Sequence, residues 1–279
     1  MDRRVFNTSL LAGSLAGLLL PGARAAETPR PAAKPVIGLL VYPGMILLDL
    51  TGPLTVFNIM QADIHLIGAS MAPVMTDVGI PVTPTHSFET AATGLDVLFV
   101  PGGLKGTVDG MNDPRTIDFV ARRGETARFV TSVCTGALLL GAAGLLKGYK
   151  ATSHWYVRDL LPLMGATMIA DRVVSDRNRI TAGGVTAGID FGLALAAQLT
   201  DEDTARRIQL LIEYDPQPPF AAGSPERAGP EATQAVLTQR GPLIRLAEQA
   251  GRGARPAAGR ACGAAGLPPG RGFAAAAAA

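Results

Sequence analysis

The chain has 279 residues, of which 48% are hydrophobic and 17% are charged, and its formal net charge is +2. This length and composition favour one α/β domain with extensions over two full domains. Residues 36–230 carry 14 basic and 19 acidic side chains, and only 5% of the chain is aromatic. These values argue against a basic nucleic-acid surface and against stacking platforms for bases, so we expect no nucleic-acid partner.

The N-terminus contains the three parts of an export signal in order. The opening MDRRVFN has paired arginines, residues 10–20 form a short apolar stretch, and residues 23–25 are an A-x-A cleavage sequence. The apolar stretch is too short to span a bilayer as a helix, so we expect no stable membrane insertion. We predict a twin-arginine signal peptide over 1–26, export to the periplasm or beyond, and a linker over 27–35. The alternative is a disordered or anchoring N-terminus.

The elements predicted next alternate between strands and helices. Strands are predicted at 36–42, 63–70, 95–103 and 128–133, and hairpins within 73–88 and 172–184. Helices are predicted at 47–60, 112–123, 136–146, 154–165, 186–199 and 201–214. Pro53 should bend or restart the first helix. The alternation indicates an α/β fold with a mostly parallel sheet covered on both faces.

The C-terminal part loses this pattern and gains Pro, Gly and Ala. We predict one more helix at about 231–249 and disorder over 251–279. The predicted organisation is therefore a main domain over 36–228, a helical extension over 229–250, and a low-complexity tail over 251–279. The two cysteines are Cys134 and Cys262, and Cys262 lies in the tail, so we expect no structural disulfide.

Three of the predicted strands end at residues that carry chemistry. The first strand leads to Asp49, the third to Gly102 and Gly103, and the fourth to Cys134. In open α/β sheets, sites form at the carboxyl ends of the strands. We therefore expect these residues to converge.

Cys134 lies at a strand-to-helix corner, before Thr135 and Gly136. At such a corner the positive end of the helix favours the thiolate, so we expect a lowered pKa and a nucleophile. The alternative is a small buried apolar residue, a common role of free cysteine.

Asp49 stands among aliphatic residues in MILLDLTGP, where burial would keep its carboxyl protonated at neutral pH. Beside a thiolate, it could donate a hydrogen bond and then a proton, although a helix-capping or turn role is also open. His154 is a possible assisting residue, but a packing role is favoured for it. Gly102, Gly103 and Gly136 are predicted to bind substrate or an oxyanion through their backbone.

Neither a phosphate-binding loop nor a dinucleotide fingerprint is present, and the histidines at 65, 86 and 154 are far apart in the sequence. We therefore expect no cofactor and no metal, and a small-molecule substrate.

Several stretches over residues 36–227 together resemble one family. They are LLDLTGP, HLI, VPGG, VTSVCTGALLLGAAGLL, KATSHW, AGGVTAGIDF and PPFAAGSP. The chain is similar to the ThiJ/PfpI superfamily, whose domain resembles class I glutamine amidotransferases, and within it to the isonitrile hydratases. The resemblance implies a flavodoxin-like three-layer sandwich with a cysteine nucleophile elbow, usually a homodimer.

The resemblance also implies an activity, the hydration of an isocyanide to an N-substituted formamide. Its nucleophile corresponds to Cys134, its acid to Asp49, and the residue after the nucleophile to Thr135. Many other relatives have histidine after the cysteine, so Thr135 argues against a Cys-His dyad of that type. Two routes are open. Either the Cys134 thiolate attacks the isocyanide carbon while Asp49 protonates it, or protonation by Asp49 comes first and Cys134 holds and polarises the substrate.

Other functions are also compatible with these residues. One is a glyoxalase- or deglycase-like activity on α-oxoaldehydes that uses Cys134 with His154. A second is ligand sensing, as in AraC-type regulators, but the 65 residues after Tyr214 are rich in Pro, Gly and Ala and do not resemble paired helix-turn-helix motifs. A third is redox sensing by oxidation of Cys134 to sulfenic or sulfinic acid.

Overall fold

The computed structural model describes residues 34–254, and the structural statements below concern that part of the chain. The predicted signal peptide, nearly all of the predicted linker, Cys262 and most of the predicted tail lie outside it. Among the described helices, none combines the length and the apolar character needed to cross a membrane.

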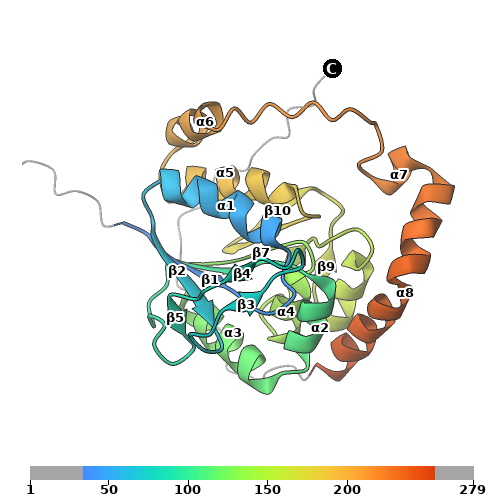
Figure 1. The fold of residues 1–279 in the computed structure, drawn as a ribbon, viewed down its shortest axis with the longest axis horizontal. Helices are drawn as coiled ribbons and strands as arrows, with labels where there is room; N and C mark the ends of the chain where they lie inside the picture. The colour runs from blue at the N-terminus through green and yellow to red at the C-terminus, as the bar shows by residue number, and fades with distance from the viewer. Residues whose placement is uncertain (1–33, 255–279) are drawn as a thin grey trace, which may run out of the picture. The chain divides into compact units, whose positions relative to one another are not determined.

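A seven-stranded sheet forms the centre of the described chain (Figure 1). Its strands, in spatial order, are β10 (Val173–Asp176), β11 (Arg179–Ala182), β7 (Phe129–Val133), β6 (Val97–Val100), β1 (Val36–Leu40), β2 (Asp63–Gly68) and β5 (His86–Ser87). All neighbours are parallel except β10 and β11, which form the predicted hairpin. The prediction of a mostly parallel sheet is confirmed.

Helices cover both faces of this sheet, as predicted. On one face are α1 (Leu47–Ile59), α5 (Ala187–Leu199) and α6 (Glu202–Leu211). On the other are α2 (Leu104–Met111), α3 (Pro114–Thr126), α4 (Gly136–Ala142), the 3-10 helix η1 (Arg158–Met164) and α8 (Pro230–Gly253). The short helix α7 (Pro225–Ala228) precedes α8. The central strands of the sheet are rich in apolar residues, as is typical of strands that are buried on both faces.

Aromatic side chains in the core pack α1 against the sheet and against α5. Phe57 of α1, Phe99 of β6 and Phe191 of α5 are fully buried, and their ring centroids lie 5.4–6.5 Å apart. Pro53 lies inside the continuous helix α1, so the helix does not restart there. Its ring packs closely on Gly188 of α5, where a Cβ would come within 3.1 Å of it, so tertiary packing holds the helix through the proline.

Other predicted boundaries were also wrong. The region 154–165 forms a turn followed by the 3-10 helix η1, which contains Pro162 and therefore lacks one backbone donor. Helix α4 ends at Ala142, because Gly144 adopts a positive φ of 78°. Helix α8 extends to Gly253 and so includes the first residues of the predicted tail.

Several short elements join these parts. The hairpin predicted within 73–88 consists of β3 (Val74–Met75) and β4 (Pro81–Val82), but the end of that segment joins the main sheet as β5. Helix α2 and the two-stranded sheet of β8 (Lys150–Ala151) and β9 (Thr167–Met168) were not predicted.

Candidate active site

The three predicted strand ends meet. Because β1, β6 and β7 are neighbours in the sheet, the segments that follow them lie side by side. Asp49 comes from the first turn of α1 after β1, Gly102 and Gly103 follow β6, and Cys134 follows β7 directly. The predicted convergence is confirmed.

Cys134 adopts an unusual backbone conformation at the corner before α4. Its φ is 57°, in the left-handed region that residues other than glycine rarely occupy. Its N–H donates to the carbonyl oxygens of Ala182 (3.0 Å) and Gly183 (2.8 Å), and its own carbonyl accepts from Ser153 Oγ (2.8 Å). Neighbouring segments therefore hold the strained residue from both sides, as is typical of functional positions.

Asp49 is fully buried beside Cys134. Its Oδ2 accepts a hydrogen bond from the Gly102 N–H at 2.8 Å, and its carboxyl also interacts with the Cys134 thiol. Its Oδ1 contacts no other donor among the described residues at hydrogen-bonding distance. A Cβ on Gly102 would lie 2.7 Å from Asp49 Oδ2 and 2.7 Å from Cys134 Cβ, so the two side chains meet where only glycine fits between them.

Burial raises the pKa of both groups. The pKa of Asp49 rises to about 7, mainly because the charged form is desolvated, although the Gly102 N–H and the Cys134 thiol partly offset this and Asp77 adds to it. The prediction of a carboxyl that retains its proton near neutral pH is supported. Burial and then the Asp49 charge also raise the pKa of Cys134 well above its ordinary value. The expectation of a lowered thiol pKa was therefore wrong, because burial outweighs the helix end.

Two backbone amides oppose this effect at the sulfur. The N–H groups of Thr135 and Val185 donate to Cys134 and lower its pKa. Thr135 was predicted as part of the site, but Val185 was not. It lies in the GGVT segment before α5, and its amide reaches the sulfur only through the packing of β11 and α5 beside β7. These amides are the donors placed to stabilise a sulfur anion.

Asp77 is a second residue that the sequence did not indicate. It lies between β3 and β4, and its Oδ1 accepts from the Leu47 N–H at 2.9 Å. Asp77 thus caps the start of α1, while Asp49 lies inside the first turn and caps nothing. The capping role considered for Asp49 is therefore filled by another residue, and Asp49 can face Cys134.

The three predicted glycines are all placed at close contacts. The Gly102 N–H donates to Asp49, and the Gly103 N–H donates to Thr135 Oγ1 at 2.9 Å. A Cβ on Gly136 would approach the Val100 carbonyl oxygen. Their role in binding a substrate or an oxyanion stays a prediction, and the Gly102 and Gly103 amides already have acceptors.

His154 lies near the nucleophile but contacts it through backbone atoms. Its N–H donates to the Cys134 carbonyl at 3.3 Å, and its ring packs on Tyr156 with centroids 3.8 Å apart. Burial, with the positive charge of Arg240, lowers the pKa of His154 to about 4. Its ring is therefore neutral at pH 7, and no direct hydrogen bond links it to the thiol. This geometry favours the packing role.

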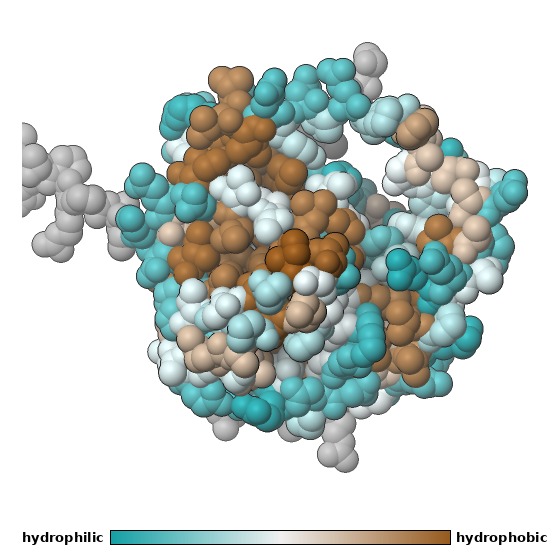
Figure 2. Space-filling model, in the orientation of Figure 1, coloured by the Kyte–Doolittle hydropathy of each residue, from teal (hydrophilic) through white to brown (hydrophobic). Residues whose placement is uncertain are grey.

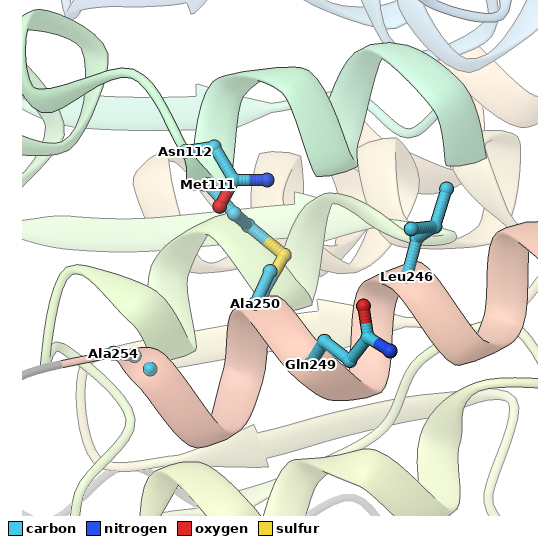
Figure 3. A pocket seen from close by; sticks show the side chains of 7 residues that line it. Met111, Asn112, Leu246, Gln249, Ala250 and Ala254 are labelled. Carbon is cyan, nitrogen blue, oxygen red and sulfur yellow. The ribbon is translucent and has the colours of Figure 1, made fainter.

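Both members of the pair are fully buried. Gly102 and Thr135 beside it are buried as well, whereas His154, Tyr156 and Val185 are half buried. A pocket of about 260 Å³ lies elsewhere, between α2 and α8 (Figure 3). It is lined by Met111, Asn112, Leu246, Gln249, Ala250, Gly253 and Ala254. In residues 34–254 no three or more His, Cys, Asp or Glu side chains gather as a metal site would need.

Comparison with known proteins places this site among relatives. The DJ-1/PfpI family pattern matches residues 36–198. Isonitrile hydratase of Pseudomonas putida is 46% identical over 211 residues, which are 75% of this chain and 92% of that protein. A crystal structure of a ThiJ/PfpI family protein from Pseudomonas syringae is 45% identical with a TM-score of 0.77, covering 83% of this chain and 98% of that one. A DJ-1 superfamily protein from Salmonella typhimurium, solved as a cysteine-to-alanine mutant, is 26% identical with a TM-score of 0.60, covering 66% and 100%.

Proposed function

The chain belongs to the DJ-1/PfpI family, and as a close homologue of isonitrile hydratase we propose that it hydrates an isonitrile to an N-substituted formamide. The reaction is that of a hydro-lyase acting on a small-molecule substrate. The observation that carries the proposal is the buried pair of Asp49 and Cys134 across Gly102, with two amides directed at the sulfur.

The pair is suited to hold one shared proton. At neutral pH the Asp49 carboxyl, with a pKa of about 7, exchanges its proton readily, while the Cys134 thiol retains its own. With one proton between the two groups, transfer from sulfur to carboxylate yields a thiolate beside a carboxylic acid. The amides of Thr135 and Val185 favour this form because they stabilise the sulfur anion.

The covalent route uses both groups on one carbon. The terminal carbon of an isocyanide accepts a nucleophile and a proton, so the Cys134 thiolate forms the C–S bond while Asp49 protonates that carbon, giving a thioimidate. The Asp49 carboxylate then takes a proton from water, whose oxygen attacks the carbon, and returns this proton to the nitrogen. Collapse of the adduct breaks the C–S bond, and Asp49 takes the hydroxyl proton. The products are the formamide, the thiolate and the acid.

The acid-first route requires the same two residues in a different order. Asp49 protonates the carbon before any C–S bond forms, and Cys134 holds and polarises the substrate. Mass spectrometry of protein quenched during turnover separates the routes. An adduct of the intact substrate on Cys134 supports the covalent route, and its absence under rapid quench supports the other.

The test of the proposed function is a turnover assay on the mature protein with cyclohexyl isocyanide. We expect Cys134→Ala and Asp49→Asn each to lower kcat/KM at least about a thousandfold, because each removes a group used in the chemical step. Cys262→Ser is a matched cysteine control that keeps activity. A Cys134→Ala protein that hydrates the isocyanide at a near wild-type rate contradicts the covalent route.

The same assay addresses the α-oxoaldehyde alternative. That chemistry would pair Cys134 with His154, whose ring is neutral and makes no hydrogen bond to the thiol. We expect no turnover of methylglyoxal by protein that hydrates cyclohexyl isocyanide. Turnover of methylglyoxal that is lost in His154→Gln would instead favour the glyoxalase-like activity.

A homodimer is part of the proposal. An apolar patch, visible over β3 and β4 in Figure 2, is formed by exposed side chains of the hairpin, the loop before it and the start of α1. These residues are Leu48, Met71, Met75, Val78 and Ile80, 47–60% exposed. Such a patch is typical of a protein interface. Light scattering tests it, and Val78→Asp with Ile80→Asp should yield a monomer if a second copy covers the patch.

Export by the twin-arginine route completes the proposal, and the paired arginines and apolar stretch of the N-terminus support it. Replacing both arginines by lysine in cells should retain the full-length precursor and deplete the periplasmic fraction. A mature periplasmic form that persists in this variant would contradict the proposed route.

A further inference from the structure

A chain of buried hydroxyl groups runs behind the nucleophile. Thr135 Oγ1 lies 2.8 Å from Thr107 Oγ1, which lies 3.2 Å from the Tyr42 hydroxyl. The Tyr42 hydroxyl donates to the Pro101 carbonyl at 2.6 Å, and at the other end the Gly103 N–H donates to Thr135 Oγ1. All three hydroxyl-bearing side chains are buried, so these bonds are not exchanged with bulk water.

The direction of each bond follows from which group can donate. The Pro101 carbonyl only accepts, so the Tyr42 proton points to it. The Tyr42 oxygen must then accept from Thr107, and Thr107 in turn accepts from Thr135. The reverse direction between the two threonines would leave the lone pairs of Thr107 and Tyr42 facing each other. It would also leave the Thr135 proton without an acceptor among the described residues.

The two polar groups of Thr135 therefore serve different partners. Its backbone N–H is directed at the Cys134 sulfur, whereas its hydroxyl lies between Gly103 and Thr107. The Gly103 amide that it accepts from is adjacent to the Gly102 amide that donates to Asp49. Two consecutive amides of one loop are thus held by Thr135 and by the acid of the site.

We propose that Tyr42 and Thr107 are positioning residues for the reaction, and that the Thr135 hydroxyl fixes the Gly102–Gly103 loop against Asp49 instead of donating a proton to the substrate or to Cys134. Two backbone hydrogen bonds also fix this loop. The Ile46 N–H donates to the Gly102 carbonyl, and the Thr107 N–H donates to the Gly103 carbonyl. Loss of the hydroxyl chain frees the loop on one side, so the bond from Gly102 to Asp49 weakens.

The kinetic test of this inference rests on the proposed function. A second measurement, the pH dependence of the reaction of Cys134 with an alkylating reagent, does not depend on it. The bond from Gly102 lowers the pKa of Asp49, so weakening it raises that pKa. The Asp49 charge raises the pKa of Cys134, so an Asp49 that stays neutral to higher pH lets the thiol ionise at lower pH. The other titratable groups that act on Asp49 are Cys134, Asp77, Tyr42 and Tyr156. The pKa values of both tyrosines are raised by burial, so these phenols stay neutral over the range studied and removing one changes no charge.

The experiment measures the rate of Cys134 alkylation by iodoacetamide against pH, followed on the Cys134 peptide in a Cys262→Ser background. The same proteins are assayed for kcat and KM with cyclohexyl isocyanide. The variants are Thr135→Val, Thr107→Val and Tyr42→Phe, with Thr135→Ser and Thr107→Ser as rescues that keep the hydroxyl. Thr131→Val is the matched control, because it removes a buried threonine hydroxyl, bonded to the Leu98 carbonyl, outside this chain.

We expect each of the three removals to shift the alkylation profile to lower pH, because an Asp49 that stays neutral no longer raises the pKa of Cys134. Each should also lower kcat roughly tenfold, with KM changed less, the effect of one buried hydrogen bond lost. The serine variants and Thr131→Val should retain the wild-type profile. The inference is overturned if Thr135→Val alone has an effect, since its hydroxyl would then act on the substrate or sulfur directly. It is equally overturned if the variants lose thermal stability without moving the profile.

Tyr42→Phe is the most conservative of these changes and decides the question if a valine variant does not fold. If the wild-type protein hydrates no isocyanide, the proposed function fails. The alkylation profiles then still decide whether the hydroxyl chain positions the loop.

Discussion

Asp49→Asn should stabilise the fold at neutral pH while it abolishes the proposed reaction. Folding raises the pKa of Asp49 from 3.8 to about 7, because burial disfavours its charged form. Between these values the unfolded chain has lost the proton and the folded chain retains it, so the free energy of unfolding falls as pH rises. At 1.36 kcal/mol per pKa unit, the loss amounts to roughly 4 kcal/mol by pH 7 and beyond.

An asparagine at this position cannot ionise, and its Oδ1 can accept the Gly102 N–H as Asp49 Oδ2 does. The free energy of unfolding of Asp49→Asn minus that of the wild type should therefore increase from about pH 4 to about pH 7.5 by a few kcal/mol. Urea denaturation of both proteins at the two pH values measures this difference. Contributions from other titrating groups cancel, because both proteins share them.

Asp109→Asn is a suitable control, since it makes the same substitution at a carboxyl that lies exposed on α2. If the difference for Asp49→Asn is the same at both pH values, Asp49 does not carry a raised pKa. The account of a pair that holds a shared proton is then refuted, whatever the variant does to activity.

Three further predictions follow from the same geometry. Gly102→Ala should abolish turnover and lower the melting temperature, because its Cβ would come within 2.7 Å of Asp49 Oδ2, Cys134 Cβ and the Thr135 nitrogen; an active, stable alanine variant contradicts this packing. Asp77→Ala should lower the free energy of unfolding by about 1 kcal/mol through loss of its bond to the Leu47 N–H, with Asp77→Asn losing less, as urea denaturation would show. His154→Gln should reduce the loss of stability as pH falls from about 6.5 to about 4, because the folded protein, unlike the unfolded chain, does not protonate His154 there; equal acid sensitivity in both proteins would count against a lowered pKa.

The sequence was sufficient for the parts of this protein that depend on local patterns. Apolar runs bounded by turn residues identified the strands that became β1, β2, β6 and β7, and helical spacing identified α1, α5 and α6. The parallel arrangement followed from the alternation of these elements, and the convergence of Asp49, Gly102 and Cys134 followed from the rule for strand ends. Short sequence motifs such as SVCTG also indicated the family, and the comparisons confirm it.

Local patterns failed where neighbours distant in sequence override propensity. Pro53 was expected to bend or restart α1, but close packing on glycine in α5 keeps the helix continuous. The segment before η1 was predicted as the start of a helix, yet it forms a turn whose His154 N–H donates to the Cys134 carbonyl. Neither outcome is encoded in the residues of the segment alone, since each depends on a surface brought by another element.

The chemistry of the site was decided by tertiary structure. A helix end would lower the pKa of an exposed cysteine, but the fold buries Cys134 completely beside Asp49, and desolvation reverses the direction. Asp77 and Val185 act on the site from other loops. They are distant in sequence from Asp49 and Cys134, so a local sequence pattern does not indicate these contacts. The identities of the acid and the thiol can therefore be read from the chain, whereas their proton affinities depend on burial and on neighbours that only folding brings together.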